Sequence, residues 1–158
     1  MIRPYQREGI LWLASATRRY LADDPGLGKS LQAVKAADKV KATKVLVVCP
    51  ASVVPVWAAE FAKWQDIKRM VVVVDRPKVL DTLDYKGVTI CSYERAELVS
   101  RHLATGRVHV LIVDEAHFLK TRTAQRTRRI LPLKGEALVS RADYAWFLSV
   151  TPAANKPS

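Results

Sequence analysis

Cysteine is scarce in this chain of 158 residues, which contains only Cys49 and Cys91. The two lie far apart, each at the end of an apolar run, so the sequence predicts buried thiols and not a disulfide framework. The three histidines, His102, His109 and His117, do not form zinc-ligand spacings with these cysteines. A zinc site is therefore not expected.

A long apolar run is also missing. The longest apolar stretch, residues 45–59, is interrupted by two prolines and a serine, whereas a membrane-spanning helix needs about 20 consecutive apolar residues. No signal-peptide pattern opens the chain, because Arg3, Arg7 and Glu8 break up its first apolar residues. We therefore expect a cytoplasmic protein without membrane contact.

Acidic residues are few relative to basic ones. The chain has 15 Asp and Glu against 26 Lys and Arg, a formal net charge of +11, which favours polyanionic partners and nucleic acid first. The stretch 120–134 holds six basic residues and no acid: Lys120, Arg122, Arg126, Arg128, Arg129 and Lys134. Two interpretations stay open, a solvated helix face and a surface that faces DNA phosphates, with Arg126, Arg128 and Arg129 as the candidate contacts.

Short β-rich runs alternate with amphipathic stretches along the whole chain. Apolar residues make up 49% of the sequence, and a domain of this size buries roughly 70% of its unfolded surface. The expected strands are residues 20–22, 44–49, 69–75, 87–92, 108–113 and 144–150, and the expected helices are 29–41, 52–64, 77–83, 93–104 and 124–131. This alternation predicts one α/β domain whose mostly parallel sheet is flanked by helices.

The stretch LADDPGLGKS ends like a phosphate-binding loop, with Gly28, Lys29 and Ser30 in a row. Gly26 and Gly28 let backbone amides converge on phosphate oxygens, and a following helix N-terminus adds a favourable dipole. Lys29 would then reach the β- and γ-phosphates, and the Ser30 hydroxyl would bind Mg²⁺. The general loop pattern has glycine where this chain has Asp23, so a glycine-rich turn that caps a helix is the alternative.

The stretch VLIVDEAH supplies the acidic partner that a phosphate loop needs. Its four apolar residues predict a buried strand, with Asp114 and Glu115 at the carboxyl end. Asp114 is positioned to hold Mg²⁺ through water, and Glu115 to orient and deprotonate the water that attacks the γ-phosphate. Ligands of open α/β sheets bind at the carboxyl ends of strands, so we expect this pair beside the loop.

With these motifs in this order, the chain resembles the first RecA-like lobe of superfamily-two helicases, and among them the Swi/Snf-like DNA translocases. The resemblance covers nearly the whole chain. RPYQREG at 3–9 resembles the adenine-recognising Q motif, and CPAS at 49–52, with the W-x-x-E-F-x-x-W that follows it, resembles motif Ia. ICSY at 90–93 resembles motif Ib, DEAHFLK at 114–120 resembles motif II, and TP at 151–152 with Asn155 resembles the end of motif III. The first motif of this family itself has Asp at the position of Asp23, which accounts for the missing glycine.

The resemblance implies a role for individual residues. It implies an ATP site formed by Gln6, Asp24, Gly26, Leu27, Gly28, Lys29 and Ser30, a Mg²⁺ site formed by Ser30 and Asp114, and catalysis by Lys29, Asp114 and Glu115. It also implies DNA backbone contacts from Ser52 and Ser92, and coupling between nucleotide and DNA through His117, Ser149 and Thr151. The expected cofactors are ATP and Mg²⁺, and the expected partner is DNA, double-stranded and bound without sequence preference.

Three aromatic residues, Trp57, Phe61 and Trp64, lie on one face of the expected helix 52–64 because they are three and four positions apart. Packing in the core is the interpretation that we favour for them. Stacking on nucleic-acid bases is the alternative.

The resemblance ends at motif III, and the second RecA-like lobe of the family, with its arginine fingers, has no counterpart in residues 1–158. We therefore expect a helicase ATP-binding domain that binds nucleotide but hydrolyses it poorly without that lobe, supplied in cis or in trans. Val150 stands where motif III usually has glycine, which favours the alternative of a non-catalytic nucleotide- or DNA-binding adaptor. An RNA helicase of the D-E-A-H type fits motif II but not motifs I and Ia. The Q motif begins so close to Met1 that we expect a small bacterial or phage-type protein.

Overall fold

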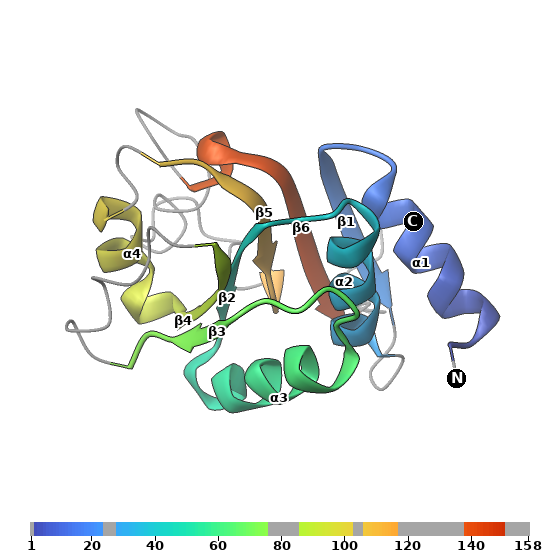
Figure 1. Ribbon diagram of the computed structural model, residues 1–158, viewed down its shortest axis with the longest axis horizontal. Helices are drawn as coiled ribbons and strands as arrows, with labels where there is room; N and C mark the ends of the chain where they lie inside the picture. Colours follow the sequence, from blue (N-terminus) through green and yellow to red (C-terminus); the bar gives the residue numbers. More distant parts are fainter. Residues whose placement is uncertain (1, 24–27, 76–85, 103–105, 117–137, 151–158) are drawn as a thin grey trace, which may run out of the picture.

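The computed structural model of the chain describes residues 2–23, 28–75, 86–102, 106–116 and 138–150. Six strands form one sheet in the order β1-β6-β5-β2-β4-β3, and every neighbouring pair is parallel (Figure 1). The strands are β1 (Arg18–Asp23), β2 (Lys44–Cys49), β3 (Val71–Val73), β4 (Gly87–Ser92), β5 (Val108–Val113) and β6 (Ala142–Val150). The expected α/β fold with a mostly parallel sheet is confirmed.

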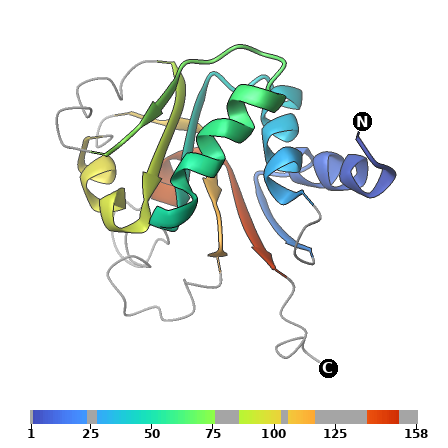
Figure 2. The ribbon, with the colours of Figure 1, turned by 90° about the horizontal axis from the view of Figure 1, so that it is seen from below.

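Helices lie on both faces of this sheet. The α-helices are α1 (Pro4–Ala14), α2 (Lys29–Lys39), α3 (Val54–Trp64) and α4 (Ala96–His102), and single 3₁₀ turns form η1 (Ala51–Val53), η3 (Tyr93–Arg95) and η5 (Leu138–Arg141). In both ribbon views, α3, α2 and α1 follow one another across the molecule, and α4 lies at the opposite end from α1 (Figures 1 and 2). None of the helices in the described ranges has the length and apolar character needed to cross a membrane.

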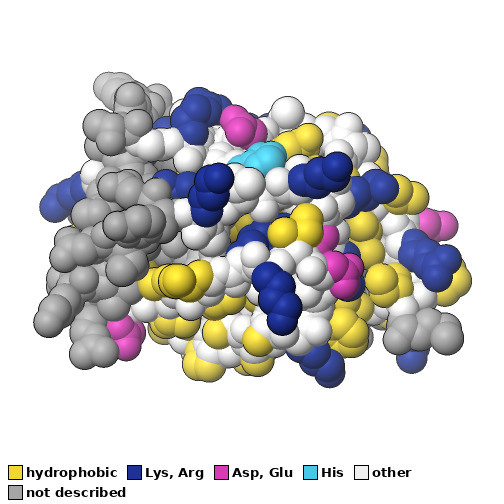
Figure 3. Space-filling model, in the orientation of Figure 1, with side chains coloured by type: hydrophobic (Ala, Val, Ile, Leu, Met, Phe, Trp, Pro, Cys, Tyr) yellow, Lys and Arg dark blue, Asp and Glu magenta, His cyan; other side chains and the backbone are white. Residues whose placement is uncertain are grey.

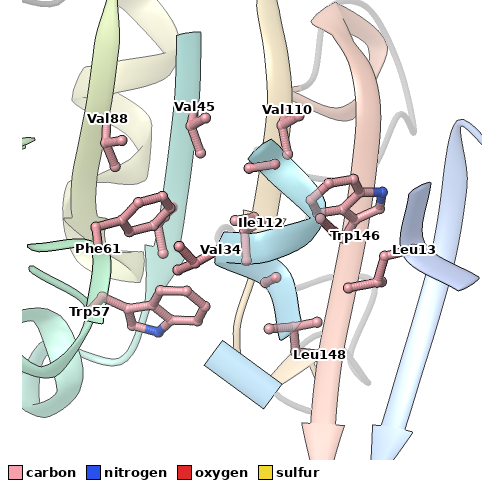
Figure 4. Close-up of a cluster of buried hydrophobic side chains, with 14 of the residues drawn as sticks. Leu13, Val34, Val45, Trp57, Phe61, Val88, Val110, Ile112, Trp146 and Leu148 are labelled. Atoms are coloured by element: carbon pink, nitrogen blue, oxygen red, sulfur yellow. The ribbon is translucent and has the colours of Figure 1, made fainter. Parts of the chain in front are cut away.

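The core has two halves because alternate strand side chains point to opposite faces. On β2, Val45 and Val47 belong to a cluster with residues of α1, α2 and α3, shown in Figure 4, whereas Leu46 and Val48 belong to a cluster with residues of α4 and η5. All four are at most 2% exposed. Continuous burial of this kind is typical of a parallel strand that is covered on both faces, as its apolar run predicts.

Three predicted strands, 44–49, 87–92 and 108–113, coincide with β2, β4 and β5. The predicted strands 20–22 and 144–150 each extend further towards the N-terminus, as β1 and β6. The predicted strand 69–75 was too long, since β3 keeps only three of its residues. Its first residue, Arg69, is buried: Nη1 lies 2.9 Å from Oδ1 of Asp38, and Nε donates to the Ala42 carbonyl at 2.7 Å. The Arg69 side chain is therefore held among buried groups, and β3 begins two residues later.

The predicted helices 29–41, 52–64 and 93–104 correspond to α2, α3 and α4, and the last two are each preceded by a 3₁₀ turn. The helix α2 ends before Lys41, which has a left-handed φ of 55°. The predicted helices 77–83 and 124–131 lie outside the described residues. Sequence analysis therefore found the helices that cover the sheet but missed α1.

The helix α1 has a recognisable start. Pro4 occupies the first turn, and the Arg3 backbone N–H donates to Oε1 of Gln6 at 2.9 Å, which satisfies one of the amides that a helix start leaves open. Gly9 lets α1 approach α2 closely, because a Cβ on Gly9 would lie 1.6 Å from Oε1 of Gln32. The Q-motif stretch is therefore a helix held against α2.

The prediction of two buried thiols is confirmed. Cys49 and Cys91 are free cysteines at the ends of neighbouring strands, and neither is exposed. Burial raises the pKa of Cys49 to about 12, and the nearby carboxylates of Asp114 and Glu94 add to this shift. Burial also raises the pKa of Cys91. Both thiols therefore stay protonated at neutral pH and behave as small apolar side chains.

Candidate nucleotide-binding site

The carboxyl ends of the strands bring the sequence motifs to one edge of the sheet. In parallel pairing, Val48 of β2 aligns with Cys91 of β4 and with Val113 of β5. The segments that follow these strands therefore lie together, and the loop between β1 and α2 opens at the same edge, because Asp23 of β1 pairs with the last residue of β6. This is the edge at which open α/β sheets bind their ligands.

A cleft of about 350 Å³ lies at this edge. Gly28, Lys29 and Ser30 line it from the start of α2, and Asp114 and Glu115 from the end of β5. Its remaining lining residues are Val53, Val56 and Trp57, from η1 and α3. The fold therefore places the two motifs that sequence analysis paired for nucleotide binding, some 85 residues apart in the chain, in a single cleft.

The start of α2 is shaped for an anion. Gly28 is the N-cap residue and has a left-handed φ of 74°, and a Cβ there would lie 2.7 Å from Nε2 of Gln6. The left-handed φ favours glycine at this position. The first turn of α2 begins with Lys29 and Ser30 and carries no acidic residue, so its open backbone N–H groups and the helix dipole favour a negatively charged ligand.

Gln6, the predicted adenine contact, lies directly behind this helix start. It is 8% exposed, its Oε1 accepts the Arg3 N–H, and its Nε2 lies close to Gly28. The structure thus places the Gln6 side chain beside Gly28, the N-cap residue of α2. Its contact with adenine stays a prediction.

The carboxylate of Asp114 is fixed in place by hydrogen bonds. The indole Nε1–H of Trp57 donates to Oδ2 at 2.8 Å, and the Glu115 backbone N–H donates to Oδ1 at 2.9 Å. The Asp114 backbone N–H in turn donates to the Val48 carbonyl at 2.8 Å. Each carboxylate oxygen keeps acceptor capacity beyond these bonds. Metal-binding carboxylates are commonly held by such outer hydrogen bonds.

Glu115 sits in a sharp, strained turn. Its φ of 54° is left-handed, a conformation that costs a residue with a side chain about 1–3 kcal/mol. The hydroxyl of Tyr93 donates to the Asp114 carbonyl at 2.6 Å and lies 3.4 Å from the Glu115 carbonyl, so a buried side chain from η3 clamps the turn. Strain of this kind is concentrated at functional sites.

The residues of the cleft fit a magnesium ion. Mg²⁺ prefers hard oxygen ligands together with substrate phosphates, and the Ser30 hydroxyl and the Asp114 carboxylate both line the cleft beside Lys29. Trp57 and Tyr93 were not predicted to support this site, although the expected core position of Trp57 is confirmed at 2% exposure. The signal was available, since a buried indole N–H or phenol O–H usually finds a partner.

The other predicted site residues do not line the cleft or lie outside the described residues. Ser52, in η1, is exposed at the carboxyl edge, whereas Ser92 is only 9% exposed and offers little surface to a phosphate. Ser149, on β6, is fully buried, so any coupling role would act through its neighbours. Val150 is the last residue of β6. The predicted residues Asp24, Gly26, Leu27, His117, Arg126, Arg128, Arg129 and Thr151 lie outside the described ranges.

A second cavity, of about 360 Å³, lies at the opposite edge of the sheet. It opens at the amino ends of β2, β3 and β4, where its lining includes Lys41, Lys68, Lys86 and Met70. The two cavities are of similar volume, so volume alone does not show which of them binds nucleotide. Position and chemistry favour the first cleft, since it combines a helix N-terminus with two carboxylates at the edge where such folds bind ligands.

Comparison with known proteins gives consistent matches over the chain. A family model described as the SNF2-related domain matches residues 5–158. A SWI/SNF-related matrix-associated actin-dependent regulator of chromatin subfamily A-like protein 1 homolog from Caenorhabditis elegans is 36% identical over 159 residues, which cover 98% of this chain and 22% of that protein. The DNA annealing helicase and endonuclease ZRANB3 of Mus musculus is 33% identical over 163 residues, 98% of this chain and 15% of that protein. The chain thus spans about a fifth of the length of these curated relatives.

One solved structure, titled Sulfolobus solfataricus SWI2/SNF2 ATPase core in complex with dsDNA, is similar to this chain with a TM-score of 0.77 and 27% sequence identity. The similarity covers 99% of this chain and 33% of that one. The sequence resemblance and the fold similarity therefore extend over the same residues.

Proposed function

The chain belongs to the SNF2-related family, and from this premise we propose that it is the ATP-binding lobe of a DNA-dependent ATPase that moves on double-stranded DNA. The observation that carries the proposal is the single cleft that joins Lys29 and Ser30 to Asp114 and Glu115. A helix N-terminus with a lysine suits the β- and γ-phosphates, and the fixed carboxylate suits the metal ion that accompanies them.

Each residue of the cleft has a distinct task in this proposal. Lys29 binds the terminal phosphates, and Ser30 and Asp114 hold Mg²⁺, which when bound neutralises phosphate charge. Glu115 orients the attacking water and accepts its proton. Gln6, whose side-chain amide lies beside Gly28, contacts the adenine base.

A second RecA-like lobe, in cis or in trans, completes the proposed enzyme. Residues 5–158 match the family model, and the chain corresponds to 33% of the similar solved core. In phosphoryl transfer, arginines supplied across an interface stabilise the transition state. We propose that these arginines come from the second lobe, so residues 1–158 hold nucleotide and contribute the water-activating carboxylate.

The alternative is a non-catalytic adaptor that binds nucleotide or DNA. Val150 in the place of the motif III glycine is the observation that favours it. Intact Lys29, Asp114 and Glu115 favour the enzyme. DNA-stimulated ATP hydrolysis, measured with a second lobe supplied, separates the two functions.

DNA binding is the part of the proposal that can be tested on the chain alone. Figure 3 shows Lys and Arg side chains dispersed over the visible face, with fewer acidic ones, so no single stripe of the described surface marks a DNA track on that face. The acid-free run 120–134 carries the highest local density of basic residues in the sequence and lies outside the described residues.

We predict that replacing Arg126, Arg128 and Arg129 by alanine weakens binding to a short DNA duplex and flattens its salt dependence. Each lost phosphate contact should reduce the slope of log K against log salt by about 0.9. Fluorescence anisotropy at several salt concentrations measures this slope. The matched control replaces Lys41, Lys68 and Lys86, which removes the same charge from the cavity at the amino ends of β2, β3 and β4. Equal slopes for the two variants would mean that the arginine run is an ordinary solvated surface.

A further inference from the structure

Two hydrogen bonds tie the carboxylate pair to the segments expected to meet DNA. Trp57, which bonds Oδ2 of Asp114, lies on α3, and α3 continues directly from η1, where Ser52 is exposed. Tyr93, which bonds the Asp114 carbonyl, follows Ser92 without an intervening residue. Each of the two segments predicted to contact the DNA backbone is therefore followed by an aromatic residue that bonds to the turn at Asp114 and Glu115, after β5.

The bond from Trp57 is geometrically constrained. Its side chain is 2% exposed and packs against Phe61, with ring centroids 6.1 Å apart, inside the cluster between α2, α3 and the sheet (Figure 4). The indole cannot rotate within this packing without disturbing the core. A small displacement of α3 would therefore move the N–H relative to the Asp114 carboxylate.

Tyr93 acts on the same turn from the other core cluster. It is 5% exposed, packs in the cluster with α4, and places its hydroxyl 2.6 Å from the Asp114 carbonyl and 3.4 Å from that of Glu115. The left-handed conformation of Glu115 needs support of this kind to persist. The carboxylate pair is thus held from both faces of the sheet, once at a side chain and once at the backbone.

We propose that Trp57 and Tyr93 are positioning residues for the turn at Asp114 and Glu115, and that Trp57 links DNA contact at η1 to the affinity of the cleft for Mg²⁺-nucleotide. The proposal rests on the proposed function, since it presumes that the cleft binds nucleotide. When DNA binds and shifts η1 and α3, the Trp57 N–H moves and the orientation of the Asp114 carboxylate changes. The affinity of this carboxylate for Mg²⁺ changes with its orientation. Linkage is reciprocal, so Mg²⁺-nucleotide must change DNA affinity by the same factor.

The first test is Trp57→Phe, which keeps an aromatic ring in the core and removes only the N–H donor and part of the ring. The gain in ADP affinity that Mg²⁺ gives to the wild-type chain should fall about tenfold or more, as for lost outer-shell partners of metal ligands. Because Trp57 also lines the cleft, the comparison uses the ratio of ADP affinities with and without Mg²⁺, measured in the same variant. Titration calorimetry with and without MgCl₂ measures both values.

The matched control is Trp64→Phe. Trp64 lies on the same helix and is only partly buried, and its ring carries the Lys63 ammonium 4.7 Å from the centroid. This variant should keep the full effect of Mg²⁺ on ADP affinity. Tyr93→Phe should lower that effect as Trp57→Phe does, and thermal melting checks that each variant is folded.

A second measurement needs no variant. In the wild-type chain, the indole N–H resonance of Trp57 should shift on addition of a short DNA duplex without nucleotide, while that of Trp64 stays in place. A fixed Trp57 resonance at saturating DNA would overturn the proposal, as would an unchanged effect of Mg²⁺ in folded Trp57→Phe. If the wild-type chain fails to bind ADP at all, the proposed function itself is wrong and this inference falls with it.

Discussion

Residues 1–158 alone are expected to hydrolyse ATP near the background rate, with or without DNA, and the matching second lobe should raise the rate by roughly 10³–10⁵. The cleft supplies a metal site and a water-activating carboxylate from Asp114 and Glu115. The arginines that stabilise the transition-state charge in this class of reaction are expected from the other lobe. Phosphate release, measured with both lobes and DNA present, tests the difference.

The variant Glu115→Gln tests whether the hydrolysis restored by the second lobe depends on the Glu115 carboxylate. The amide matches the carboxylate in shape but cannot accept the proton of the attacking water, so it should remove the restored hydrolysis while Mg²⁺-ATP still binds. Glu97→Gln is the matched control, because this glutamate lies on α4 in an exposed pair with Arg101. Strong turnover by a monomer of residues 1–158 would contradict the account, since an arginine finger would then come from within the chain.

The second large effect is expected from Lys29→Ala, which should abolish measurable binding of Mg²⁺-ADP. Hydrogen bonds to charged groups contribute about 1.5–3 kcal/mol each, roughly ten- to hundredfold in affinity. Among the described residues that line the cleft, Lys29 is the basic one. Half of an interlobe site binds weakly from the outset, so a loss of this size should take the affinity out of the measurable range.

The fold should survive this substitution. Lys29 is partly exposed at the first position of α2, whereas the packing of the helix comes from buried residues such as Leu31, Ala33 and Val34. Lys39→Ala is the control, because this exposed lysine lies in the last turn of the same 11-residue helix, about 15 Å away at 1.5 Å per residue. ADP affinity that is unchanged in Lys29→Ala by titration calorimetry would remove Lys29 from the site.

Much of the architecture could be predicted because it depends on local patterns. The continuous apolar runs of β2 and β5 are typical of strands covered on both faces, and Gly28-Lys29-Ser30 is a local signal for a phosphate loop. The strand and helix alternation then required a parallel sheet, which places both motifs at one edge. The cleft between them therefore follows from topology.

The remaining features depend on contacts between distant residues. Arg69 fits the start of a strand in the sequence, but in the structure its buried guanidinium pairs with Asp38 of α2, 31 positions away. The hydrogen bond from Trp57 to Asp114 joins residues 57 positions apart, so no local sequence pattern predicts it. The helix α1 lacks most of the usual start signals, because its N-cap residue is Arg3 and its first turn holds no acidic residue, so Pro4 alone marks its start.

The measurement that tests the central claim most directly is the location of bound Mg²⁺-ADP, mapped by backbone amide NMR on the wild-type chain. The account predicts that the largest shifts occur at Lys29 and Ser30 and at Asp114 and Glu115, the two sides of the cleft at the carboxyl edge. The amides around the second cavity, at Lys41, Lys68 and Lys86, should stay unchanged. Shifts confined to that opposite edge, or no shift at any ADP concentration, would contradict the account.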